Sequence, residues 1–108
     1  MSFDINGVLA DMASAMKGAV GDNWEKVKPT ADLFLQRKKE RLELLAELRI
    51  TGELSPEKFE SRLQDEKLVA EAELNAVSVI SKATAQRAAN AAMEVVGKAV
   101  ATAIATAL

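Results

Sequence analysis

The chain has 108 residues, of which 49% are hydrophobic and only 4% aromatic, and its formal net charge is −2. This length suits one domain, and the small negative charge gives no reason to expect nucleic acid as a partner. The absence of Cys and His excludes disulfides and thiolate chemistry and removes the commonest metal ligand. We therefore expect neither an enzyme nor a protein that holds a metal or another cofactor.

Residues 4–20 are predicted to form an amphipathic helix, because apolar residues recur there every three or four positions. Asp4 is well placed as the N-cap of this helix. Pro29 ends or kinks whatever precedes it, or begins the next helix. We therefore expect a break in the helical structure at residues 22–29.

Two further helices are predicted, at residues 30–51 and 55–108. Gly52 suits the left-handed conformation that often follows a helix, and Ser55 is a good N-cap. No proline follows position 56, so the last helix is expected to run unbroken for roughly 80 Å. The residues that we expect to shape the turn are Gly52, Leu54, Ser55 and Phe59.

The short turn can only join antiparallel neighbours, so the predicted fold is all-α, a long antiparallel helical hairpin. If the same register continues, the first helix extends the second. Residues 4–20 then lie antiparallel to residues 86–104, with Met12 near Val96. The single domain, residues 1–108, then divides into an amphipathic helix (1–21), a break (22–29), a charged hairpin (30–75) and an Ala-rich helix (76–108).

Most of the charged residues lie in residues 22–75. The glutamates there have no histidine beside them, so we expect solvated helix faces with ion pairs three or four residues apart. The basic run at residues 36–41 is followed at once by acidic residues, which favours an exposed helix surface. Lys38 interrupts the apolar stripe, and its long stem can reach solvent. The glutamates in question are Glu40, Glu43, Glu47, Glu66 and Glu73.

Residues 77–108 are rich in alanine and amphipathic. Small residues that recur every four positions allow helix backbones to approach closely. This pattern fits packing against residues 4–20 of the same chain, contact between subunits, or packing in a membrane or pore wall. The residues that we expect to carry this assembly or packing are Met12, Met16, Met93, Val96, Gly97, Val100, Ala101 and Ile104.

One segment carries leucines at helical spacing, then a Gly, an aliphatic residue, a Ser cap, an acidic residue, Phe-Glu and a basic position. The matching residues are Leu45, Leu48, Gly52, Leu54, Ser55, Glu57, Phe59, Glu60 and Arg62. In these features residues 42–68 resemble the SHOCT family, a short helical hairpin module of bacterial and phage proteins. The family is thought to mediate oligomerisation, so the resemblance implies assembly. The chain departs from the family in two ways. Its last helix is expected to run on far past the basic position, and that position is Arg62, whereas lysine is commoner there in the family.

The sequence as a whole predicts a non-enzymatic structural protein, bacterial or phage in type and conceivably part of a virion. It would act through helix packing of the coiled-coil kind, in a homo-oligomer or a larger complex. The alternative is a membrane-active or pore-forming helical assembly, such as a phage ejection protein. We see no secretory signal and no ordinary membrane span, so we expect the protein in the cytoplasm or in an assembled particle.

Overall fold

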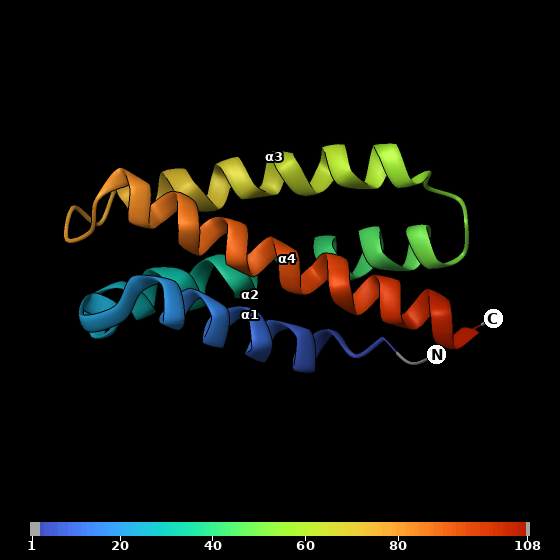
Figure 1. Cartoon of the computed structure of the whole chain (residues 1–108), viewed down its shortest axis with the longest axis horizontal. Helices are drawn as coiled ribbons and strands as arrows, with labels where there is room; N and C mark the ends of the chain where they lie inside the picture. The colour runs from blue at the N-terminus through green and yellow to red at the C-terminus, as the bar shows by residue number, and fades with distance from the viewer. Residues whose placement is uncertain (1–2, 108) are drawn as a thin grey trace.

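The computed structural model describes residues 3–107, and it confirms the all-α prediction. Four α-helices follow one another, each antiparallel to the one before it (Figure 1). Their ends lie together at either end of an elongated bundle of 43 × 22 × 19 Å. The four helices are α1 (Ile5–Val20), α2 (Trp24–Ile50), α3 (Pro56–Asn75) and α4 (Lys82–Ala107), with a short 3-10 turn η1 (Gly21–Asn23) after α1.

The first helix is as predicted, but the second begins earlier than residue 30. The Asp4 side chain caps α1 by accepting a hydrogen bond from the backbone N–H of Asn6, at 3.1 Å. The chain then reverses at Gly21, whose φ is +74°, and α2 starts at Trp24. Pro29 lies inside α2 on an exposed side, where water can satisfy the carbonyl that its missing N–H leaves free. The predicted break is therefore confined to η1, and α1 folds back beside α2 instead of extending it.

The turn between α2 and α3 has the predicted form. Gly52 has a φ of +87°, the left-handed conformation that glycine adopts without a steric penalty. The N–H of Gly52 donates to the carbonyl of Arg49 at 3.2 Å, and that of Leu54 donates to the carbonyl of Leu48 at 3.0 Å. The Ser55 hydroxyl accepts from the N–H of Lys58 at 3.2 Å, so both helix ends at this turn are capped.

The prediction of one helix over residues 55–108 is wrong, because the chain reverses again between Asn75 and Lys82. Ser78 takes a left-handed conformation with φ +67°, and the Ser81 hydroxyl then caps α4 by accepting from the N–H of Thr84 at 3.1 Å. The Asn23 side chain donates to the carbonyl of Val79 at 3.1 Å, which ties this reversal to η1. Folding back lets the apolar face of α4 be buried within the same chain.

The last helix, α4, is the shared neighbour of all the others. It packs against α1, α3 and also α2, whereas α1 and α3 do not touch within residues 3–107. Small side chains make this possible, because they let helix axes come close together. The alanines of α4 that are fully buried are Ala85, Ala88, Ala89 and Ala92.

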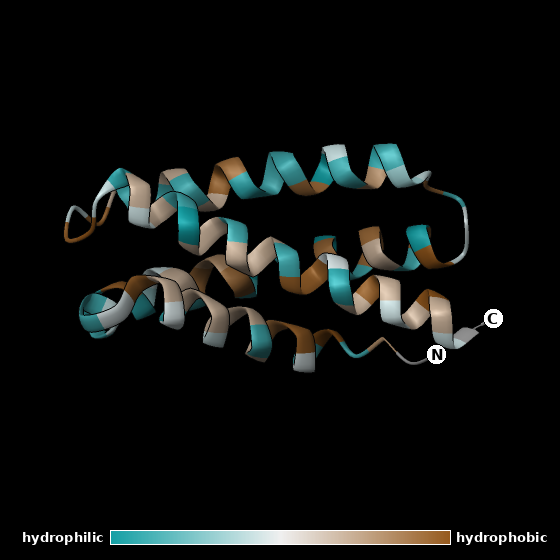
Figure 2. Cartoon of the chain, in the orientation of Figure 1, coloured by the Kyte–Doolittle hydropathy of each residue, from teal (hydrophilic) through white to brown (hydrophobic). Residues whose placement is uncertain are grey.

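Charge is divided between layers of the bundle and not between its two ends. Figure 2 shows α3 as largely hydrophilic, whereas α1 and α4 carry more apolar segments. The two apolar helices lie against each other, because α1 packs along α4. The apolar half of the sequence therefore buries much of itself within the chain.

The left-handed turn at Gly52 can be tested with a matched pair of glycine substitutions. A Cβ at Gly52 or at Gly18 would meet no atom within 4 Å, and only Gly52 has a positive φ. Gly52→Ala should lower the free energy of unfolding by about 1 kcal/mol through backbone strain. Gly18→Ala, in α1, should raise it by about 0.5 to 1 kcal/mol. Urea unfolding followed by circular dichroism measures both, and equal effects would contradict the turn geometry.

Ser78 offers a second test, at the reversal that the sequence did not reveal. Ser78→Gly should raise the free energy of unfolding by up to about 1 kcal/mol, because a left-handed conformation costs glycine no Cβ clash. Ser81→Ala removes the N-cap of α4 and should lower it by about 1 kcal/mol. If residues 56–107 formed a continuous helix in solution, Ser78→Gly would instead destabilise the protein.

Candidate functional site

Most of the predicted packing residues lie inside the bundle. Met12, Met16 and Val96 have no exposed surface, and Val100 and Met93 are also buried. They belong to one hydrophobic core that all four helices contribute to. The core of the chain therefore accounts for most of the surface of these five residues, and Met93 and Val100 also border hollows between α3 and α4.

The other three predicted residues, Gly97, Ala101 and Ile104, lie at the edge of α4 that faces α3. They line an open groove of about 390 Å³ between the two helices. Val100 adds to its apolar floor, and Ala101 is itself exposed. We call this the α3–α4 groove; its remaining lining residues are Arg49, Pro56, Phe59, Glu60, Leu63, Glu94 and Lys98.

The predicted turn residues meet the predicted packing residues at this groove. Phe59 is buried in the core and also lines the groove. Gly52 and Ser55 form the turn that brings the start of α3 beside the end of α4, and Leu54 packs against the core. Two sets of residues far apart in the sequence thus share one end of the bundle.

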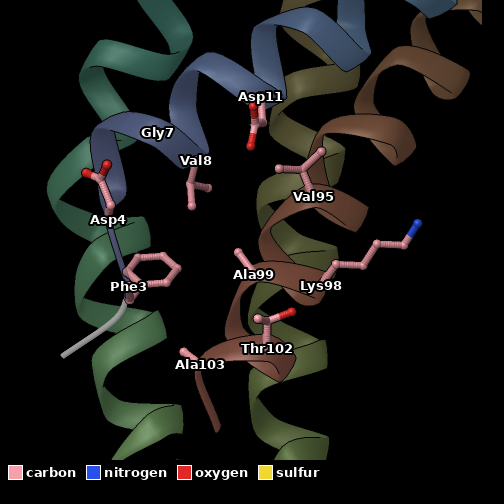
Figure 3. Close-up of a pocket in the computed structure, with 10 residues that line it drawn as sticks. All are labelled: Phe3, Asp4, Gly7, Val8, Asp11, Val95, Lys98, Ala99, Thr102 and Ala103. Atoms are coloured by element: carbon pink, nitrogen blue, oxygen red, sulfur yellow. The ribbon is translucent and has the colours of Figure 1, made fainter. Parts of the chain in front are cut away.

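A second open groove, of about 460 Å³, runs along the opposite side of α4. Figure 3 shows its walls, with Phe3 and Val8 on one side of the gap and Ala99, Thr102 and Ala103 on the other. Its lining is mostly apolar, and Asp4, which lines it, also caps α1. We call it the α1–α4 groove.

Lys98 stands on the ridge of α4 between the two grooves. It lines both of them, and in Figure 3 its side chain extends away from the other labelled residues. The exposed edge of α4 is thus a narrow ridge with an apolar hollow on each side. Such an arrangement can receive side chains from another helix on either flank of the ridge.

The expectation of solvated glutamates is wrong for Glu66. Only 4% of this residue is exposed, and its two oxygens lie 2.6 Å from Arg41 Nε and 3.0 Å from Lys38 Nζ. The Lys38 contact lacks hydrogen-bond geometry, so we describe it as an ion pair. Lys38 therefore turns toward a buried carboxylate instead of reaching solvent, and Arg37 and Glu73 form a further bridge between α2 and α3.

These ion pairs join α2 to α3. Each of these two carboxylates has a cation on the neighbouring helix as its partner. On the surface, the hydrogen bond to Asp32 raises the pKa of Lys28, and that pair lies in the open on α2. Within the described residues no cluster of three potential metal-binding side chains occurs.

Sequence reasoning missed a set of exposed apolar side chains on the charged helices. Leu33 and Leu44 of α2 are 65% and 54% exposed, and Leu68 and Val69 of α3 are also exposed. The signal was available, because these residues fall off the apolar stripe that each helix buries. Scattered surface leucines are common in proteins. Exposure alone therefore does not identify an interaction surface, and the spacing of these residues along each helix has to be considered as well.

No family model, curated protein or solved structure matches this chain. Among the helices of residues 3–107, none is long and apolar enough to cross a membrane. The site therefore has to be interpreted from its own geometry.

The Glu66 ion pairs should contribute to stability in a way that one substitution exposes. Glu66→Ala leaves Lys38 and Arg41 without their carboxylate and should lower the free energy of unfolding by about 2 kcal/mol. The double variant Glu66→Leu, Lys38→Met should have a free energy of unfolding closer to that of the wild type than Glu66→Ala has, because an apolar pair needs no counter-charge. Glu60→Ala, an exposed site on the same helix, is the control. A Glu66→Ala effect no larger than that of the control, in urea unfolding, would show that the network is not formed.

Proposed function

We propose that this chain is a non-enzymatic assembly protein that acts by packing its helices against those of neighbouring subunits, in a homo-oligomer or a larger complex. The observation that carries the proposal is the α3–α4 groove. After four helices have packed, this hollow still has an apolar floor that includes Gly97, Ala101 and Ile104. An exposed apolar hollow on a small protein usually marks a place where something binds.

The composition of the α3–α4 groove favours a protein partner. Its apolar floor is bordered by Arg49, Glu60, Glu94 and Lys98, and an apolar centre inside a charged rim is typical of protein interfaces. Gly97 adds room, since a Cβ there would meet no atom within 4 Å. A helix from another subunit could therefore approach α4 closely at this point.

The resemblance of residues 42–68 to the SHOCT module supports the same function. Its matching residues form the turn that shapes the α3–α4 groove. The implied role of that module, oligomerisation, is the role that we propose here.

A pair of substitutions at Gly97 tests this use of the groove. Gly97→Ala should raise the free energy of unfolding by about 1 kcal/mol, because glycine disfavours the helix interior. Gly97→Leu fills the groove and should reduce the mass measured by light scattering at tens of micromolar. Gly18→Leu makes the same change on α1, outside both grooves, and should leave the mass unchanged.

Three results would count against the proposal. A wild-type protein that stays a single monomeric species at tens of micromolar does not self-associate. Wild-type protein that releases a dye from lipid vesicles, with Gly97→Leu equally active, would instead favour the membrane-active alternative. An assembly that Gly97→Leu leaves intact would show that the groove is not its interface.

A further inference from the structure

The outer face of α2 carries a regular line of four residues. Leu33, Arg37, Glu40 and Leu44 are spaced four, three and four positions apart and all are exposed, which is the spacing of a coiled-coil seam. At about 100° per residue, Leu33 and Leu44 fall within about 20° of one another. We call these four residues the α2 seam.

The α2 seam points away from the bundle. The buried side of α2 includes Ala31, Phe34, Leu42 and Leu45, and these fall on the opposite side of the helix at the same angular spacing. The helices α1, α3 and α4 all pack against α2 from that side. Leu33, Glu40 and Leu44 therefore lie on the outer face of α2, and Arg37 lies at the edge of that face, where it reaches Glu73 of α3.

The order of residues in the seam is self-complementary. When a second copy of the helix is laid antiparallel, Leu33 comes opposite Leu44, and Arg37 comes opposite Glu40. Every contact then occurs twice, as it must in a two-fold symmetric interface. Thr30 comes opposite Glu47 in the same register, so that a hydroxyl faces a carboxylate.

We propose that two copies of the chain pair antiparallel through the α2 seam, with Leu33 against the partner subunit's Leu44. This inference rests on the proposed function, assembly by helix packing, and names one interface and its register. A parallel pair is disfavoured, because it sets Arg37 against Arg37 and Glu40 against Glu40. A leucine at each end and a charge pair of opposite sign in the middle fix the antiparallel arrangement.

The existing ion pair of Arg37 is compatible with this contact. Arg37 reaches Glu73 within the chain while its side chain stays 56% exposed, and a guanidinium has five N–H donors. Because one helix from each copy forms the contact, the interface is small. We therefore expect a weak dimer that forms at tens of micromolar.

Cysteine crosslinking tests the register directly, because the chain contains no cysteine of its own. Leu33→Cys and Leu44→Cys proteins are made separately, mixed in equal amounts at tens of micromolar and oxidised. The mixture should give a disulfide-linked dimer, whereas each protein alone should give little. Positions 33 and 44 are about 16 Å apart along one helix, so neither variant can pair with its own kind in the proposed register.

Four further variants separate this interface from others. Leu33→Ser should weaken the dimer at least about tenfold in sedimentation velocity, since both copies lose a buried leucine. Leu68→Ser removes a comparably exposed leucine, 53% exposed, from α3 and should have no effect. Glu40→Arg should weaken the dimer, and adding Arg37→Glu should restore it by exchanging the charges.

The outcomes distinguish this interface from the wider proposal. A wild-type monomer at these concentrations overturns the α2 pairing and the homo-oligomer alike, and leaves only assembly with a different protein. A wild-type oligomer in which the mixed cysteine proteins do not crosslink, and in which Leu33→Ser changes nothing, overturns the α2 pairing and leaves assembly standing. Crosslinking within Leu33→Cys alone would show a parallel pair and would also overturn it.

Discussion

Close packing around α4 is the constraint on which the rest of the structure depends. Its buried alanines let α1, α2 and α3 all contact this one helix, and a larger side chain at any of these positions would force a neighbour away. The three reversals of the chain, at η1, at residues 51–55 and at residues 76–81, follow from this arrangement, because together they place α1, α2 and α3 beside α4. The scarcity of aromatic residues is then no weakness, since a tightly packed alanine interface gains its stability from many close contacts.

The sequence revealed helices and caps better than it revealed the path of the chain. Asp4, Gly52 and Ser55 could be interpreted correctly because each satisfies a local requirement of backbone geometry or hydrogen bonding. The reversal at Ser78 could not, because the apolar spacing continues across residues 74–85 as it would in one long helix. Periodicity shows which face of a helix is buried, and two helices that face the same core have the same pattern as one unbroken helix. Serine is not a residue type that indicates a left-handed turn, so the positive φ of Ser78 had no signal in the sequence.

The candidate site was predicted in part for the same reason. The packing residues of α1 and α4 were identified as one set, but five of them lie in the core of this chain and the other three border the α3–α4 groove. The helix that an apolar stripe packs against is decided by the path of the chain and cannot be read from the spacing of the apolar residues. The ion pairs of Glu66 were missed because they join helices whose relative rotation the sequence leaves undefined. The α2 seam was missed because its leucines lie outside the buried stripe.

The two proposed surfaces have different symmetries, and together they define what kind of assembly is possible. A two-fold contact through the α2 seam forms a dimer and cannot extend further, because each copy contributes the same surface to the interface. The α3–α4 groove does not pair with the same groove of a second copy, because a hollow needs a protruding helix from another part of its partner. Because α2 and α4 lie on a diagonal of the bundle, with α1 and α3 on either side, pairing through α2 leaves both α4 grooves on the outside of the dimer. Such a dimer has two outward α3–α4 grooves, one on each copy. A contact at these grooves would link dimers into a ring or a filament or attach them to a larger complex.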